Sequence, residues 1–243
     1  MSIRIPRLVS TIDQRLLINY RVDPAVAQTL IPEGMRPRLV DGSAVAGICQ
    51  ISQRHLRPRW LRPRVGVATQ GSAHRIAVEW DDATGTHSGV FIAKRHSASR
   101  LAQLLGGRVF PGIQLPAAFD GDASDDLIRV SIDGDDVHVR AEVAVRSELR
   151  SSLFGDDLHA ASEFFRDGGV GWSPARDGGL EGLSIESDQW RVDPGEVLTI
   201  ESSYFDALPG GSATLDSVLV MRNVPMNWSA PSELEPRVFA TSA

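Results

Sequence analysis

The sequence is poor in several residues that often carry function. Its 243 residues include one cysteine, two tyrosines and a single lysine, Lys94, among 25 lysines and arginines. One cysteine excludes an internal disulfide framework and fits a reducing compartment. Because Cys49 lies in the apolar run AVAGICQI, we expect a buried core thiol there rather than a nucleophile.

Long apolar runs and a surplus of positive charge are also absent. No window approaches the roughly 18 apolar residues of a membrane span, and MSIRIPRLVSTIDQ lacks the apolar stretch of a signal peptide. The formal net charge of -6 argues against a nucleic-acid partner, since nucleic-acid phosphates are bound by clustered cations. We therefore predict a cytoplasmic protein with neither a membrane nor a nucleic-acid partner.

Metal and nucleotide cofactors are not indicated either. The six histidines are scattered without the spacing of metal ligands, and no carboxylate cluster accompanies them. Glycine-rich fragments such as residues 168–171 lack the strand-to-helix context of a phosphate loop. We expect no cofactor and no metal.

Short apolar segments bounded by Gly, Asp or Pro dominate the chain, and they are rich in Val and Ile. This pattern is typical of β-strands. The predicted strands are Leu16–Val22, Ala44–Gln53, His74–Trp80, Gly89–Arg95, Leu127–Ile132, Val137–Val145, Val197–Tyr204 and Ser217–Asn223. We therefore predict a mainly antiparallel β protein with a few short helices, in one domain over residues 1–243.

Turn and cap residues indicate where hairpins and helices begin or end. Asp133-Gly134 predicts a hairpin turn, because glycine tolerates the positive φ of tight turns. Asp23-Pro24 predicts a helix start, with a carboxylate cap before proline. Further helices are predicted at Ser97–Leu105 and Leu158–Phe165, and a long loop at Asp167–Gly182.

Several segments in order resemble a known family: LLINYRVDPAVAQTLIPEGMRPRLVDGSAVAGI, GVFIAKRHSASRLAQLLGGRVFPG, EFFRDGGVGWSP, IESSYFD and MRNVPMNW. Together they resemble the acetoacetate decarboxylase-like superfamily, and within it the uncharacterised YqjF-like branch. The resemblance implies a cone-like, largely antiparallel β-barrel with an interior cavity, a few helices outside it, and assembly into homo-oligomers.

The resemblance also implies where a lysine would be needed. Decarboxylases of the superfamily form a Schiff base between a lysine amine and a keto acid. Aligned on VFIAKRH, their paired lysines fall near Ala102 and Gln103, neither of which is lysine. Lys94 occupies a different position, where the YqjF-like relatives carry arginine.

The end of the strand Gly89–Arg95 holds the candidate catalytic residues Lys94 and His96. Strand alternation predicts that they share one face with Val90 and Ile92, and Arg95 takes the other. Lys94 is either an imine-forming nucleophile with His96 as proton shuttle, a fixed charge for a carboxylate or enolate, or a lysine that simply reaches water. Arg95 and Ser97 are candidate ligand-binding residues at the same rim, where Ser97 caps the next helix.

Polar residues on two other segments are further candidates for ligand binding. Glu201 and Ser203 alternate with Ser202 and Tyr204 on a predicted strand, so either pair faces a cavity or the edge is solvated. Ligand-binding candidates from these segments are Arg15, Arg21, Glu201, Ser203 and Tyr204. The segment Arg54–Arg64 is either an exposed loop or a basic patch that binds a partner.

These patterns lead to one functional prediction and one alternative. We predict an enzyme that acts on an anionic or carbonyl-bearing small molecule in the barrel cavity by lyase, aldol or cyclisation chemistry. The alternative is a non-catalytic barrel that binds a small ligand or another protein. Fold alone does not decide between them.

Overall fold

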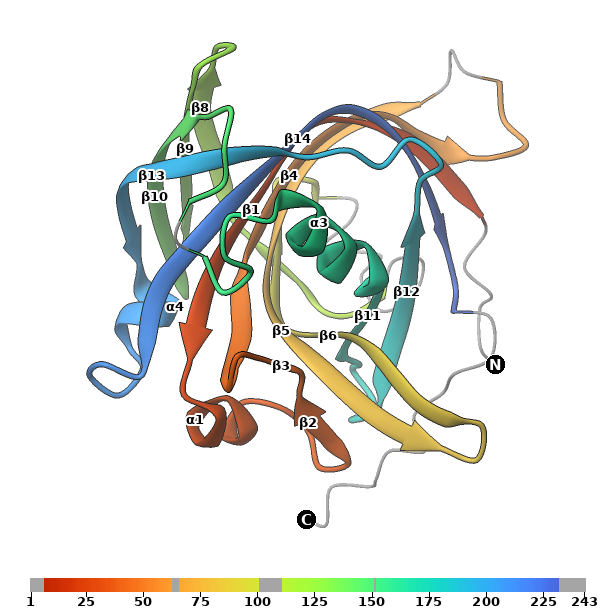
Figure 1. The fold of residues 1–243 in the computed structure, drawn as a ribbon. Coiled ribbons are helices and arrows are strands. Elements are labelled where there is room, and N and C mark those ends of the chain that lie inside the picture. Colours follow the sequence, from red (N-terminus) through yellow and green to blue (C-terminus); the bar gives the residue numbers. More distant parts are fainter. Residues whose placement is uncertain (1–6, 63–65, 101–110, 151, 232–243) are drawn as a thin grey trace.

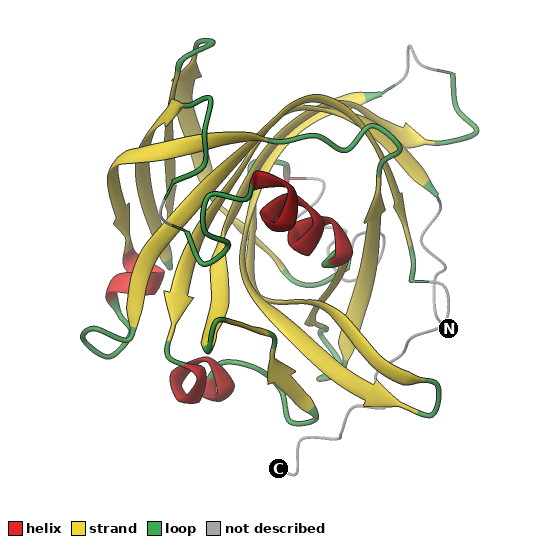
Figure 2. Ribbon diagram, in the orientation of Figure 1, coloured by secondary structure: helices red, strands yellow, loops and turns green. Residues whose placement is uncertain are grey.

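The computed structural model describes residues 7–62, 66–100, 111–150 and 152–231, and β-strands dominate it (Figures 1 and 2). The strands are β1 (Leu8–Val22), β2 (Met35–Pro37), β3 (Leu39–Val40), β4 (Ser43–Pro58), β5 (Val67–Asp82), β6 (Gly85–Ser97), β7 (Gln114–Pro116), β8 (Ala118–Ala123), β9 (Leu127–Gly134), β10 (Val137–Val145), β11 (Val170–Pro174), β12 (Leu180–Glu186), β13 (Asp193–Ser202) and β14 (Ala213–Ser229). The helices are α1 (Pro24–Thr29), α3 (Leu158–Asp167) and α4 (Ser203–Asp206). The prediction of a mainly β protein with few helices is confirmed.

Hydrogen bonding closes part of the sheet into a ring. The strands follow the order β1-β4-β5-β6-β11-β12-β14, and β14 pairs again with β1. All these pairs are antiparallel except β6–β11, which is parallel. The same sheet continues from β14 through β13, β10, β9 and β8, which we call the flanking sheet. In Figure 1 the flanking sheet stands beside the ring.

Helix α3 fills the opening of the ring, contrary to the expectation that helices lie outside (Figure 1). Its Phe164 and Phe165 pack against Leu17 of β1 and Leu219 of β14. The other face of these strands, which carries Ile18 of β1, packs on the flanking sheet. Strands β1 and β14 therefore have an inner face toward α3 and an outer face toward the flanking sheet, a consequence of strand alternation.

Two local predictions are confirmed at helix starts. Asp23 caps α1, since its Oδ1 accepts from the backbone N–H groups of Ala25 and Val26 at 2.8 and 3.2 Å. The helix predicted at Leu158–Phe165 is α3, capped by Asp157. The helix predicted at Ser97–Leu105 does not begin at Ser97, because Ser97 is the last residue of β6. Residues 101–105 of this prediction lie outside the described residues.

Other local predictions are wrong. The predicted loop Asp167–Gly182 contains β11 and the start of β12, which pair with each other and join the sheet through β6 and β14. The predicted loop from Arg54 begins inside β4, which runs to Pro58. The predicted hairpin itself is confirmed as β9–β10, but Gly134 pairs with Val137, so the two connecting residues are Asp135 and Asp136 rather than Asp133-Gly134.

Candidate functional site

Two dipeptides on neighbouring ring strands carry the chemistry of the site. They are His74-Arg75 on β5 and Lys94-Arg95 on β6, and the register pairs His74 with Lys94. Successive strand residues point to opposite faces. Arg75 and Arg95 therefore lie on the inner face of the ring, and His74 and Lys94 lie on the outer face.

A β-bulge overturns the predicted face pattern of β6. The register shifts between His74 and Arg75, so that Lys94 pairs with His74 but Ile92 pairs with Arg75. The bulge leaves one residue of β6 without a partner and reverses the alternation beyond it. Ile92 is consequently on the inner face, where Arg95 also lies, while Lys94 and His96 are on the outer face.

The outer face holds a compact polar group at the flanking sheet. Lys94 Nζ lies 2.8 Å from Asp136 Oδ2, and His96 Nε2 lies 3.0 Å from Asp136 Oδ1. Burial by itself would raise the pKa of Asp136, but the hydrogen bonds and charges of Lys94 and His96 outweigh it and hold the pKa below its ordinary value. Lys94 is thus a cation paired to a carboxylate, with its side chain 36% exposed.

His74 lies deeper beside this ion pair and is 1% exposed. Its ring centroid is 6.0 Å from that of His96 and 4.7 Å from that of Tyr204. Within the described part of the chain, neither ring nitrogen of His74 has a hydrogen-bond partner. Burial, reinforced by the charges of His96 and Lys94, lowers the pKa of His74 to about 3. We call His74, Lys94, His96, Asp136 and Tyr204 the seam cluster.

The C-terminal candidates are arranged differently from the predicted strand. Ser203 and Tyr204 belong to α4, because β13 ends at Ser202. Ser203 Oγ accepts from the backbone N–H of His138 at 3.0 Å, and Glu201 lies 3.4 Å from His138 Nε2. Tyr204 therefore joins the seam cluster through His74, whereas Glu201 is an exposed residue beside His138.

The inner face carries a second group, which we call the ring cluster: Arg15, Asn19, Cys49, Arg75 and Arg95. Arg75 is 4% exposed and donates to Asn19 Oδ1 at 2.6 Å. Its guanidinium carbon lies 4.7 Å from the ring centroid of Phe165 in α3. Burial lowers the pKa of Arg75 to about 10, against the opposing effect of Cys49. No described residue accepts a hydrogen bond from the Nε of Arg75.

Arg15 approaches the same place from β1. It is 8% exposed, and its Nε donates to Cys49 Sγ at 3.1 Å. Its guanidinium carbon lies 5.6 Å from the centroid of Trp190, and its Nη1 has no acceptor among the residues that the structure describes. No carboxylate of the described residues forms an ion pair with Arg15 or with Arg75.

Arg95 completes the ring cluster from β6. Its Nε donates to Ser173 Oγ of β11 at 2.7 Å. Burial lowers the pKa of Arg95 to about 10, and the charges of Cys49 and Glu181 oppose that shift. Glu181 itself accepts from the backbone N–H of Gly112 at 2.7 Å. The three basic residues predicted as one rim are therefore divided between two faces of β6.

Two remaining predicted residues have local partners. Arg21 Nε lies 2.8 Å from Asp216 Oδ1, and this carboxylate also accepts from the backbone N–H of Leu153. Ser97 Oγ accepts from the backbone N–H of Ser99 at 3.1 Å. Neither residue is in the ring cluster or the seam cluster.

Sequence reasoning missed His74, Arg75 and Asp136, and it treated Cys49 as core. The segment HRIAVEW was recognised as a strand, but its first two residues are polar and adjacent. In a strand buried on both faces, adjacent polar residues place one group in each interior. That pattern could have identified His74 and Arg75, whereas nothing in the sequence links Asp136 to Lys94.

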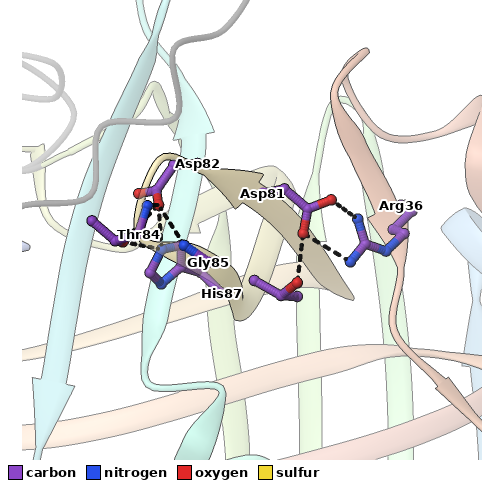
Figure 3. Close-up of polar contacts among 7 residues, drawn as sticks. Arg36, Asp81, Asp82, Thr84, Gly85 and His87 are labelled. Atoms are coloured by element: carbon purple, nitrogen blue, oxygen red, sulfur yellow. Dashed lines mark hydrogen bonds and ion pairs between the residues drawn. The ribbon is translucent and has the colours of Figure 1, made fainter.

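A third polar group at the end of the β5–β6 hairpin is structural. Figure 3 shows Asp82 accepting from Thr84, Gly85 and His87, and Asp81 bound by Arg36 of β2. Hydrogen bonds from Thr84 and His87 hold the pKa of Asp82 far below its ordinary value. These residues are largely exposed and fix the turn.

Two open clefts lie elsewhere, with volumes of about 390 and 460 Å³. The first runs between β8–β9 and the ring, and the second borders β4, β5 and Ala98. None of the predicted site residues lines either cleft. Within the described ranges no group of three or more His, Cys, Asp and Glu side chains could hold a metal ion, and no helix is long and apolar enough to span a membrane.

Solved structures share this fold over nearly the whole chain. An acetoacetate decarboxylase-like enzyme from Sphingomonas wittichii RW1 matches with a TM-score of 0.60 at 14% identity, covering 96% of this chain and 95% of that one. Acetoacetate decarboxylase from Legionella pneumophila matches with a TM-score of 0.57 at 12% identity, covering 91% and 84%.

The enduracididine biosynthesis enzyme MppR in complex with pyruvate is a third match. Its TM-score is 0.59 at 13% identity, covering 95% of this chain and 90% of that one. MppR has also been solved with the condensation product of pyruvate and imidazole 4-carboxaldehyde. The low identities make this a likeness of fold. The fold is that of the acetoacetate decarboxylase-like superfamily.

A family model also matches most of the chain. A family model described as DUF2071, uncharacterized conserved protein (COG2071), matches residues 10–223. The chain belongs to this family, which confirms the superfamily and the YqjF-like branch predicted from the sequence. No curated protein matches the chain.

Proposed function

We propose that the protein is a small-molecule enzyme that binds an anionic, carbonyl-bearing substrate inside the ring, at Arg15, Arg75 and Arg95. We further propose lyase, aldol or cyclisation chemistry rather than acetoacetate decarboxylation. The observation that carries the proposal is the pair of buried guanidinium groups, Arg15 and Arg75, whose N–H donors are not all satisfied.

The energetic argument concerns the cost of burying a cation. Removing a charged group from water costs several kcal/mol unless a counter-charge and hydrogen-bond acceptors compensate. Among the described residues Arg75 finds an amide oxygen and Arg15 finds a sulfur. A substrate carboxylate would supply both the charge and the acceptors, in the two-pronged geometry that guanidinium groups favour.

The same groups support catalysis on a carbonyl compound. Fixed guanidinium charges stabilise an enolate that forms next to a carboxylate. MppR, which shares this fold, binds pyruvate, a compound that carries both functional groups. This likeness supports the choice of 2-oxo acids as candidate substrates.

Decarboxylation through a Schiff base needs a lysine amine in the same cavity. Lys94 is the only lysine of the chain, and it lies on the outer face of β6, paired to Asp136. No other lysine is available to the ring. The catalytic roles predicted for Lys94 and His96 stay predictions that concern the seam cluster.

Calorimetric titration tests the proposal with pyruvate, acetoacetate, acetate and acetone as probes. We expect pyruvate to bind and neutral acetone not to bind. Arg75→Met and Arg15→Met should each weaken pyruvate binding at least tenfold, about 1.4 kcal/mol. Arg36→Met, which removes an exposed arginine far from the ring cluster, is the matched control and should bind normally.

Two results would contradict the proposal. One is a wild-type protein that binds none of the anionic probes, and the other is unchanged pyruvate binding by both ring variants with native circular dichroism. Release of CO₂ from acetoacetate above the buffer rate would refute the exclusion of decarboxylation.

A further inference from the structure

The first cleft, between β8–β9 and the ring, has a wall of neutral polar side chains on its ring side. This wall consists of Gln14 of β1, Gln50 and Ser52 of β4, and Gln70 of β5. The register places Gln14, Ser52 and Gln70 in one row, and strand alternation puts Gln50 on the same face as Ser52. A volume of about 390 Å³ is enough for a small molecule.

Gln50 presents a buried hydrogen-bond acceptor to this cleft. The residue is 4% exposed, and no described residue donates a hydrogen bond to its Oε1. The other end of the amide is held in place, because Gln50 Nε2 donates to Ser52 Oγ at 3.3 Å and Gln70 Nε2 donates to the same oxygen at 3.3 Å. A buried amide oxygen without a donor costs free energy, which a donor on a ligand would recover.

The charged side chains of the cleft are mostly acidic. They are Asp13, Asp120, Asp122 and Asp125, with Arg129 and Arg222. If Arg54, which pairs with Asp13, and Glu142, which pairs with Arg129, are included, five carboxylates face three guanidinium groups. This surplus of negative charge attracts a cation.

Both arginines of the cleft are bound within the chain. Arg129 lies 3.4 Å from Asp122 Oδ2 and 3.2 Å from Glu142 Oε1. Arg222 donates to two backbone carbonyl groups of the β8–β9 connection at 2.6 and 2.9 Å. Neither guanidinium group is therefore presented to an anionic ligand as an unbound donor pair.

Asp120 and Asp125 are the carboxylates that remain for a ligand. Both are exposed, and neither forms an ion pair within the described ranges. Phe119 lines the same cleft and is half-buried. An aromatic ring packs against methylene groups and attracts a cation.

The arrangement suits an extended organic cation better than a metal ion. A hard metal ion needs several oxygen ligands that converge on one point. Among the described residues, no group of three or more His, Cys, Asp and Glu side chains converges in this way. A molecule with N–H donors at both ends can instead reach separate acceptors.

We propose that the first cleft is a binding site for a small aliphatic diamine, whose ammonium groups donate to Gln50 Oε1 and to the carboxylates of Asp120 and Asp125. An ammonium group has three donors and no acceptor, which matches this set of oxygens. The methylene chain packs on Phe119. The site is separate from the ring cluster, and the proposal does not rest on the proposed function.

Calorimetric titration of the full chain with 1,4-diaminobutane tests the site. We expect the wild type to bind, and to bind more weakly at about 0.15 M salt than at low salt. Gln50→Leu should weaken binding by about tenfold or more. Asp120→Asn and Asp125→Asn, which change exposed positions, should each weaken it about threefold.

Two controls accompany these variants. Glu33→Gln removes an exposed carboxylate that lines neither cleft, and it should bind the diamine as the wild type does. Urea denaturation checks the fold of Gln50→Leu, which should be at least as stable as the wild type because an unsatisfied buried amide is lost. If Gln50→Leu is unstable, the two exposed aspartate variants decide the proposal.

Two further probes define the ligand class. 1,4-Butanediol carries hydroxyl groups in place of the ammonium groups, and we expect it not to bind. Equal affinity for the diol would overturn the preference for a cation. Calcium chloride tests a metal ion, and displacement of the diamine by Ca²⁺ at equal concentration would overturn the organic ligand.

Three results with the diamine itself would overturn the site. They are no binding by the wild type, unchanged binding by Gln50→Leu and by both aspartate variants, and a loss in Glu33→Gln as large as theirs. Pyruvate titration of Gln50→Leu should match the wild type, because this residue lies outside the ring cluster. Failure of the diamine site would therefore leave the proposed function standing.

Discussion

The two faces of β5 and β6 differ in how their positively charged side chains are compensated. On the outer face, Lys94 and His96 share the carboxylate of Asp136, which the chain itself provides. On the inner face, Arg15 and Arg75 are 8% and 4% exposed and have no carboxylate partner among the described residues. The seam cluster is balanced in charge, and the ring cluster is not.

This difference is the reason why we propose a structural role for the seam cluster and ligand binding for the ring cluster. A cation that is paired within the chain gains little from an external anion. A buried cation without a counter-charge weakens the fold and binds an anion strongly, a combination often found at functional sites. The proposed substrate site in the ring rests on this imbalance of charge.

The largest effect is expected from removing the unbalanced charge. Arg75→Met should raise the free energy of unfolding by about 2 to 3 kcal/mol, because an uncompensated buried charge is replaced by a packed apolar side chain. Urea denaturation of Arg75→Met and of the exposed control Arg36→Met measures the difference. A loss of stability in Arg75→Met would mean that Asn19 and Phe165 already satisfy this guanidinium.

A somewhat smaller effect is expected in the seam on acidification. The pKa of His74 is about 3 in the folded protein and about 6.5 in the unfolded chain, so the unfolded state binds the proton first. The stabilisation is complete above about pH 6.5 and is lost as the pH falls toward 3. Between pH 7 and 5 the free energy of unfolding should drop by about 2 kcal/mol from this residue.

The variant His74→Leu isolates the contribution of this imidazole. Its urea midpoint should change less between pH 7 and 5 than that of the wild type. His159→Leu, which alters an exposed histidine of α3, is the control and should keep the wild-type pH dependence. Equal slopes for all three proteins would show that His74 is not held neutral by the fold.

The smallest effect concerns Lys94. Because its ammonium group is paired to Asp136 and lies on the outer face, we expect no imine with pyruvate. Borohydride trapping followed by intact mass tests this, since Lys94 is the only side-chain amine. Lys94→Met should change the free energy of unfolding by less than about 1 kcal/mol, as for other partly exposed ion pairs. A trapped adduct that Lys94→Met abolishes would revive the imine role.

Local sequence patterns were sufficient where neighbouring residues decide the structure. The cap at Asp23 and helix α3 follow from side chains within three residues of each helix start. The alternation in β9 and β10 follows from a hairpin whose strands adjoin in sequence. Asp167–Gly182 was misjudged because β11 is only five residues long and has glycines on both sides, and its partner β6 lies far back in the chain.

The sequence by itself determined which groups the chemistry can use: one lysine, one cysteine and many arginines in a β-rich chain. Only the tertiary structure decided where they meet. The bulge in β6 turned Lys94 away from the ring and Arg95 into it, and the β9–β10 turn carried Asp136 to Lys94. The physical reason is that the two faces of a strand become inside and outside only when the ring closes, which depends on pairings distant in sequence.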